Sequence, residues 1–275
     1  MLKSGIDWGF ETFAEYLAML RSRGCVVNTA AYIGHSSVRT WVMGADASKR
    51  EATAHEIKEM QTIVRDAMAA GAVGFASSTS PSHNGEGGLP TPSRLASDSE
   101  MMGLIKAMGE AGKGVYTVTK GGQMPVPFQE DMARQSGRPV MIAALLHNSS
   151  NPETVCKDLD NIASANSRGH RLIGQVSCCP LTMDFTLASP CPVEGLLSWK
   201  PALGLQGDAL KGVLKDAAFR QSVRAGIAAP TTFRLFNGEW DKVHVVECAL
   251  ASNVALEQPT VADIAKTQGC VTHWT

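Results

Sequence analysis

Three histidines follow short apolar runs, each where the chain changes from apolar to polar residues. His35 ends the run CVVNTAAYIG, His83 follows AVGFASS, and His147 follows PVMIAALL. Neutral imidazole is a common zinc ligand and also the usual general base near neutral pH. Three converging histidines could therefore hold a divalent metal ion and move protons in a hydrolytic reaction. We assign His35, His83 and His147 as candidate metal ligands.

Two further reactive side chains end the remaining runs, because Lys120 follows GVYTVT and Cys178 follows RLIGQVS. Arg39, four residues after His35, could present a bidentate guanidinium to a substrate carboxylate. The candidate catalytic residues are His35, His83 and Lys120, and the candidate substrate-binding residues are Arg39, Arg94 and Cys178. Glu86 or Asp184 could act as the base, and the spacing favours neither.

Each of these residues also has a structural interpretation that the sequence leaves open. His35 could be an N-terminal helix residue bonded to the backbone, and His83 could be a solvated loop residue. His147 could help to cap the helix that follows it, and Cys178 could pack as a small hydrophobe. The segment TSPSHN offers serine nucleophiles, but the chain has no G-x-S-x-G elbow.

The apolar runs alternate with amphipathic segments, which predicts parallel strands joined by helical crossovers. Strands are expected at 25–34, 72–78, 114–119, 139–146 and 171–177, and helices at 8–23, 48–71, 97–111, 127–136, 152–167 and 208–225. This pattern fits a doubly wound sheet or a (β/α) TIM-type barrel, and we favour the barrel. In both folds the carboxyl ends of the strands form one edge, where active sites lie.

The pattern weakens after residue 178, where the chain becomes rich in proline and glycine. One more strand is expected at 242–250, which gives about six βα units, two short of a complete barrel. We therefore predict a single, incomplete barrel domain over residues 1–275. Open sheet edges would expose apolar surface and unpaired backbone groups, so self-association is expected.

Composition excludes several kinds of partner. The 275 residues have a formal net charge of −1 and no basic block, so nucleic acid is an unexpected ligand. No run of about eighteen apolar residues predicts a membrane span. Seven cysteines without a repeated C-x-x-C spacing indicate a reducing compartment, and we expect a cytoplasmic protein that binds a small molecule. Dinucleotide and triphosphate motifs are absent.

Three stretches resemble the N-acyl-D-amino-acid deacylase (D-aminoacylase) branch of the amidohydrolase superfamily. They are GIDWGFETFAEYLAMLRSRGCVVNTAAYIGHSSVRTWVMG, EIKEMQTIVRDAMAAGAVGFASSTSPSHNGEGG and QVSCCPLTMDFTLASP. A G-H-x-x-x-R element of that family matches Gly34, His35 and Arg39, and a strand of small residues matches Ala70, Gly71, Ala72, Gly74 and Ser77. The likeness covers the central barrel segment of the family.

The resemblance implies a metal-dependent barrel, usually with zinc, that hydrolyses an amide bond. Several family features have no match here: a His-x-His pair on the first strand, an Asn-Cys-Gly cysteine and a Ser-Asp aspartate. Thr119 and Ala144 stand where the family has two further metal histidines. We therefore expect a hydrolase acting on an N-acyl amino acid or a related amide or ester. The alternative is a non-catalytic or partial barrel that binds a small molecule.

Overall fold

The computed structural model describes residues 9–85, 88–147, 151–178, 182–229, 234 and 236–269. The chain divides into two compact units. The first consists of residues 1–147 and 152–183, and the second of residues 148–151 and 184–275. The expectation of one domain over residues 1–275 stays a prediction.

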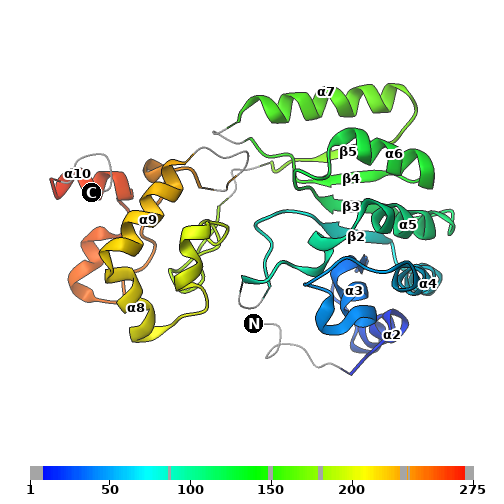
Figure 1. Ribbon diagram of the computed structural model, residues 1–275, viewed down its shortest axis with the longest axis horizontal. Helices are drawn as coiled ribbons and strands as arrows, with labels where there is room; N and C mark the ends of the chain where they lie inside the picture. Colours follow the sequence, from blue (N-terminus) through cyan, green and yellow to red (C-terminus); the bar gives the residue numbers. More distant parts are fainter. Residues whose placement is uncertain are drawn as a thin grey trace. The chain divides into compact units, whose positions relative to one another are not determined.

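The first unit is built on a five-stranded parallel sheet (Figure 1). Its strands are β1 (Ile33–Gly34), β2 (Gly74–Ser78), β3 (Val115–Thr119), β4 (Val140–Ala143) and β5 (Leu172–Gln175). They lie side by side in chain order, and every neighbouring pair is parallel. The predicted parallel α/β fold is therefore confirmed.

Helices precede, connect and follow these strands: α2 (Phe13–Arg23), α3 (His35–Met43), α4 (Ala54–Ala70), α5 (Asp98–Gly109), α6 (Val126–Ser136) and α7 (Glu153–Ser167). Local sequence fixes several of their ends. At the start of α4, the Thr53 side chain accepts a hydrogen bond from the Glu56 backbone, and the Glu56 carboxylate accepts one from the Thr53 backbone. This capping box satisfies two backbone donors that a helix start leaves unpaired. Gly71, in the left-handed conformation, ends the same helix.

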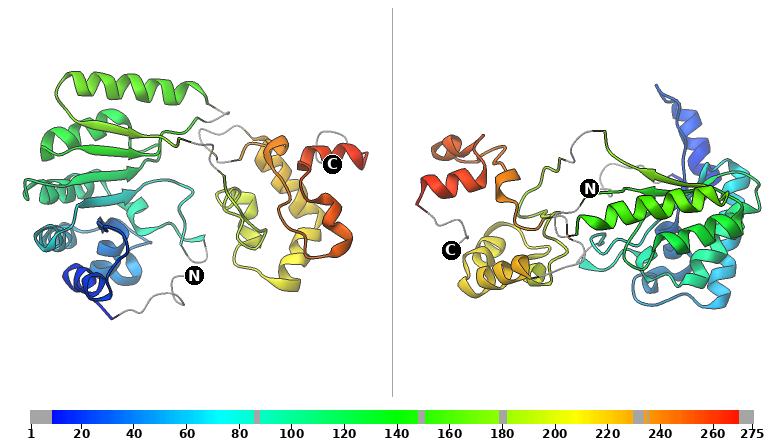
Figure 2. Two further views of the ribbon diagram at one scale, coloured as in Figure 1. Left: turned by 180° about the vertical axis from the view of Figure 1, so that it is seen from behind. Right: turned by 90° about the horizontal axis from the view of Figure 1, so that it is seen from above.

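The helices cover one face of the sheet (Figure 2). Alternate strand residues, among them Phe75, Tyr116 and Ile142, are fully buried in the main apolar core. Their neighbours in the strands are less buried, and Ile173 on β5 is 42% exposed. Because the strands follow chain order and one face carries the helices, the sheet fits a section of a (β/α) barrel better than a doubly wound sheet.

The strand expected at 25–34 is much shorter in the structure. Only Ile33 and Gly34 pair with β2, and Val26 and Val27 are exposed. β1 is an edge strand that pairs with β2 alone, and β2 itself begins only at Gly74. The apolar run therefore overstates the length of this strand.

The second unit is helical in the part that the structure describes. It contains α8 (Gly207–Lys215), α9 (Ala217–Ala228), α10 (Val261–Thr267) and the 3-10 turns η4 (Leu197–Ala202), η5 (Trp240–Lys242) and η6 (Ala251–Leu256). A small core of its own includes Trp199, Leu210 and Phe219.

Two predictions for this unit are wrong. The helix expected at 208–225 is broken at Asp216, whose extended backbone ends α8 and whose side chain caps α9. The strand expected at 242–250 is absent from the described residues, which form only isolated bridges at His244 and Val245. Among the described residues, no helix combines the length and the apolar character that crossing a bilayer requires.

Gly74, the first residue of β2, lies against the backbone of β3, which gives a test of the sheet. A Cβ at this residue would lie 1.9 Å from the Val115 carbonyl oxygen, so backbone would have to move. Gly74→Ala should lower the free energy of unfolding by at least about 2 kcal/mol. Gly122→Ala, where a Cβ meets open space, should stay within about 0.5 kcal/mol of the parent in the same urea titration. Equal stability of the two variants would contradict the observed pairing.

Candidate functional site

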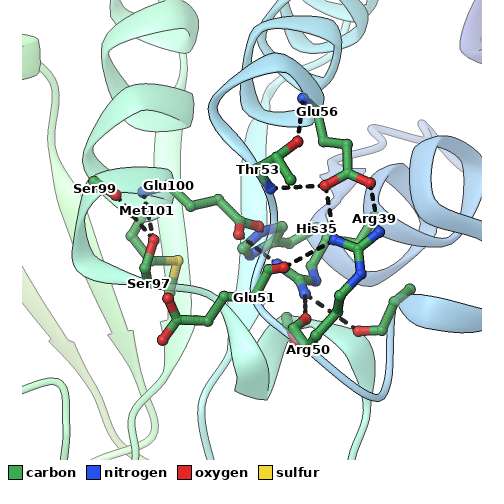
Figure 3. A network of polar contacts seen from close by, with 12 residues as sticks. His35, Arg39, Arg50, Glu51, Thr53, Glu56, Ser97, Ser99, Glu100 and Met101 are labelled. Carbon is green, nitrogen blue, oxygen red and sulfur yellow. Dashed lines mark hydrogen bonds and ion pairs between the residues drawn. The ribbon is translucent and has the colours of Figure 1, made fainter.

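A buried polar network joins α3 to α5 (Figure 3), and His35 connects it to β2. His35 is the first residue of α3, and its Nδ1 lies 2.9 Å from the Ser77 hydroxyl on β2. Its Nε2 lies 2.7 Å from a carboxylate oxygen of Glu100 on α5. The imidazole therefore bonds two side chains, and it is only 1% exposed. His35 is an N-terminal helix residue, as the structural interpretation of the sequence has it, but its ring bonds side chains and not the backbone.

Arg39 completes this network from the next turn of α3. Its Nη1 pairs with the second carboxylate oxygen of Glu100, and its Nη2 donates to the carbonyl oxygens of Ala47 and Arg50. The whole residue is 0% exposed. Arg39 was expected to bind a substrate carboxylate, but the structure gives its guanidinium a buried internal carboxylate instead.

Glu100 is the residue of this network that the sequence analysis missed. Its backbone N–H is bonded to the Ser97 hydroxyl at the start of α5, a pattern typical of an exposed helix cap. The side chain instead turns inward to His35 and Arg39. In the sequence, Ser97 stands three residues before Glu100, which predicts a helix start. This spacing does not tell whether the Glu100 side chain points to solvent or into the core.

Burial and charge set the protonation states of the network. Burial lowers the pKa of His35 below its usual value, and this outweighs the opposing effect of Glu100. Burial alone would raise the pKa of Glu100, but the hydrogen bonds and charges of His35 and Arg39 lower it below its usual value. Near neutral pH we therefore assign a neutral imidazole whose Nε2–H donates to an ionised carboxylate.

A second serine–histidine pair lies on the other face of the same strand. Ser78 follows Ser77, and successive strand residues point to opposite faces. The Ser78 hydroxyl lies 2.6 Å from Nδ1 of His83, in the loop after β2. His83 is exposed and Ser78 is half-buried. The interpretation of His83 as a solvated loop residue is confirmed by its exposure, and its ring also has a partner in Ser78.

Arg94 holds the loop that carries His83. It belongs to the 3-10 turn η3 (Pro92–Leu95), and its Nη1 donates to the His83 carbonyl oxygen at 3.1 Å and to the Asn84 side chain. Partial burial, and then the positive charge of Arg94, lower the pKa of His83 below its usual value. His83 is therefore mainly neutral near pH 7, the state in which Nδ1 can accept a proton.

Lys120 lies directly after β3, at the same edge of the sheet, and its ammonium pairs with Asp158 on α7. Next to it, the Gly121 backbone N–H donates to the Thr79 hydroxyl at 2.7 Å. The bond from Gly121 to Thr79 ties the carboxyl ends of β2 and β3 together, and the Lys120–Asp158 pair ties the end of β3 to α7. The predicted catalytic lysine thus has an acidic partner within the described residues.

The remaining predicted residues are more dispersed. His147 and Cys178 follow β4 and β5 and are exposed, so the alternative that Cys178 packs as a small hydrophobe is wrong. Asp184 lies in the second unit, and Glu86 lies outside the described residues. No three His, Cys, Asp or Glu side chains gather to hold a metal ion in the described part of the chain. The donors described here do not fit a metal site, and His35 already bonds Ser77 and Glu100.

Comparison with known proteins gives partial matches, and no family model matches the chain. The D-aminoacylase of Alcaligenes xylosoxydans xylosoxydans is 33% identical over 116 residues, which cover 42% of this chain and 22% of that protein. A crystal structure of N-acyl-D-glutamate deacylase from Bordetella bronchiseptica, complexed with zinc and a phosphonate inhibitor, matches 96% of this chain and 44% of its own, with 18% identity and a TM-score of 0.54. A crystal structure of D-aminoacylase, described as defining a novel subset of amidohydrolases, matches 59% of this chain and 33% of its own, with 28% identity and a TM-score of 0.49.

This chain resembles the D-aminoacylase branch of the amidohydrolases. The resemblance inferred from the three quoted stretches is thereby confirmed for part of the chain. The chain spans about a fifth of the length of the curated D-aminoacylase that it matches. The similarity to the Bordetella enzyme, at 18% identity, concerns the fold alone.

The lowered pKa of His35 predicts how stability depends on pH. The unfolded chain, with a histidine pKa of about 6.5, binds more protons than the folded chain below that pH. The free energy of unfolding should therefore fall as the pH decreases from 7 to 5, and His35→Gln should weaken this dependence. The lowered pKa of Glu100 affects stability at lower pH. Its contribution to the free energy of unfolding is lost as the pH falls below about 4.

Thermal unfolding midpoints between pH 5 and 8 would measure this effect. His55→Gln, at an exposed histidine of α4, is the matched control and should keep the parent's slope. An unchanged slope in His35→Gln, with a changed slope in His55→Gln, would contradict the buried neutral imidazole.

Proposed function

We propose that this chain forms a section of a (β/α) barrel hydrolase that cleaves the amide bond of an N-acyl amino acid or a closely related amide or ester. The observation that carries the proposal is the 33% identity to a D-aminoacylase over 116 residues. The parallel sheet supports it, because active sites of such folds lie at the carboxyl ends of the strands. Ser78, His83 and Arg94 lie at or follow the carboxyl end of β2.

Arg94 is the residue that we assign to substrate recognition. An N-acyl amino acid carries a carboxylate, and a guanidinium binds carboxylates through paired, charge-assisted hydrogen bonds. Arg94 is only partly buried, and its Nη1 already orients the backbone beside His83. A carboxylate bound at Arg94 would therefore place the scissile acyl group near Ser78 and His83. Arg39, which is buried, has no such access.

The related enzymes include one with a binuclear metal center and one crystallised with zinc. We therefore propose a divalent metal ion, zinc in particular, only where residues other than those described here supply further metal ligands. His35, His83 and His147 do not gather in the described part of this chain, so no step is assigned to a metal here. A cytoplasmic location, barrel closure and self-association through open sheet edges also remain proposals.

Turnover of N-acyl amino acids tests the function. The purified chain should release free amino acid from a panel of N-acyl-D- and N-acyl-L-amino acids. Arg94→Gln should raise KM at least about tenfold, because a charge-assisted pair with the carboxylate contributes about 1.5–3 kcal/mol. Arg65→Gln, which removes a surface pair with Glu110, is the control and should leave KM unchanged. Saturable binding of the panel without any turnover would instead favour the non-catalytic alternative.

A further inference from the structure

We propose that Ser93 is a positioning residue, which holds the turn that carries Arg94 and so aligns the Arg94 guanidinium with the carboxylate of a substrate. The proposal deepens the proposed function, on which its substrate class rests. Ser93 is only 1% exposed, so it contacts no substrate itself. It acts through its bonds to β2 and to α3, and through the backbone that it shares with Arg94.

The hydroxyls of Ser93 and Ser36 form a continuous chain of hydrogen bonds between η3, α3 and β2. The Ser36 hydroxyl, in the first turn of α3, donates to the Ser93 hydroxyl at 3.0 Å and accepts from the Ser93 backbone N–H at 3.2 Å. The Ser93 hydroxyl in turn donates to the Ser78 carbonyl oxygen at 2.8 Å. Each hydroxyl donates once and accepts once, which fixes its rotation. The turn η3 is therefore held against both the helix and the end of the strand.

The turn η3 depends on these bonds because it lies within a long connection. It is a single 3-10 turn of four residues without a side-chain cap, between the end of β2 at Ser78 and the start of α5 at Asp98. Such a turn has poor hydrogen-bond geometry and little stability of its own. A bond from outside this connection also reaches Arg94, but it comes from the exposed Gln123, whose Nε2 lies 3.3 Å from the Arg94 carbonyl oxygen. Ser93 is thus the buried anchor next to Arg94.

The Arg94 side chain is held on one nitrogen and open on the others. Its Nη1 donates to the His83 carbonyl oxygen at 3.1 Å and to the Asn84 side chain. Its Nη2 and Nε have no hydrogen-bond partner among the described residues, and Arg94 is only partly buried. A guanidinium held in this way can bind a carboxylate through two parallel bonds, whose strength depends on their alignment. A shift of the turn by a fraction of an ångström would therefore weaken the binding of the carboxylate.

This role predicts which kinetic constant changes when Ser93 loses its hydroxyl. The carboxylate lies away from the bond that is cleaved, so Arg94 binds it alike in the bound substrate and in the transition state. Poorer alignment therefore raises KM and leaves kcat almost unchanged. A merely structural role of Ser93 would instead lower the fraction of folded, active chain, and with it the apparent kcat, without changing KM.

Kinetics of the full chain with N-acetyl-D-alanine test the proposal. Ser93→Ala should raise KM about fivefold, which corresponds to one lost hydrogen bond of about 1 kcal/mol. In an Arg94→Gln background the same substitution should have no further effect on KM, because Ser93 acts through Arg94. Ser99→Ala removes a serine–serine bond of 2.9 Å at the exposed start of α5, so it is the matched control and should keep the parent's KM.

Thermal midpoints would identify any variant that fails to fold. Ser36→Ala, which keeps the Ser93 hydroxyl but removes its partner on α3, then takes the place of Ser93→Ala and should raise KM in the same direction. An unchanged KM in the folded serine variant, or an equal rise in KM in the Arg94→Gln background, would overturn the proposal.

A second measurement does not depend on turnover. Phenylglyoxal modifies accessible arginines, and peptide mass spectrometry would measure the rate of modification at Arg94. N-acetyl-D-alanine should protect Arg94 in the parent, and N-acetyl-D-alaninamide, which has no carboxylate, should not. Ser93→Ala should need about five times more N-acetyl-D-alanine for equal protection. Absence of protection in the folded parent would overturn the proposal.

The two measurements together separate this proposal from the proposed function. Protection that weakens in Ser93→Ala, with no hydrolysis of any N-acyl amino acid, would support the positioning role and contradict the proposed function. Hydrolysis whose KM rises in Arg94→Gln but not in Ser93→Ala would overturn the positioning role and leave the proposed function standing.

Discussion

The ion pair between Glu100 and Arg39 is the interaction on which the helix-covered side of the sheet depends. Both side chains are fully buried, so each charge has lost its hydration and relies on the other. Glu100 also accepts from His35, and Arg39 donates to two backbone carbonyls. Through these bonds α3, α5, β2 and the segment after α3 meet at one point. Removing either charge would leave the other buried without an opposite charge, although its remaining hydrogen bonds would persist.

This network also determines what each face of β2 can do. Its bond to Ser77 holds the end of the strand from the helix side, and Ser78, as the next strand residue, points to the opposite face. The loop after β2 is held separately, by Arg94 on His83 and by Ser93, whose hydroxyl donates to the Ser78 carbonyl at 2.8 Å. A rigid strand end and a braced loop are the support that a positioned hydroxyl and imidazole require. The buried His35 and the exposed His83 therefore contact successive residues at the same strand end.

Alternating apolar and amphipathic segments were sufficient to predict the parallel sheet. Helices bury at least one face of each strand that they connect, so the strands are rich in apolar residues. The first and last residues of the helices and strands were less predictable where contacts between distant segments determine them. The run ending at Ile33 is mostly apolar, yet only the part beside β2 is a strand. In the second unit, the helical pattern continues across Asp216, and only the backbone conformation reveals the break.

The site was predicted in part, since histidines that follow strands could be recognised from the sequence. Their roles could not be, because partners of His35 are 42 and 65 residues away. Glu100 and Ser78 lie within the expected helix 97–111 and strand 72–78, and nothing in their spacing singled them out. Neighbouring residues of one strand point to opposite faces of the sheet. The face to which a side chain points decides whether it is buried among partners or open to a substrate.

A double-mutant cycle between Arg39 and Glu100 tests the central role of the buried pair most directly. Arg39→Met and Glu100→Gln, alone and together, would be compared by urea unfolding of the full chain. The account predicts that each single variant loses about 3–5 kcal/mol, and that the double variant loses at least about 2 kcal/mol less than their sum. Losses that simply add, or single variants as stable as the parent, would contradict it.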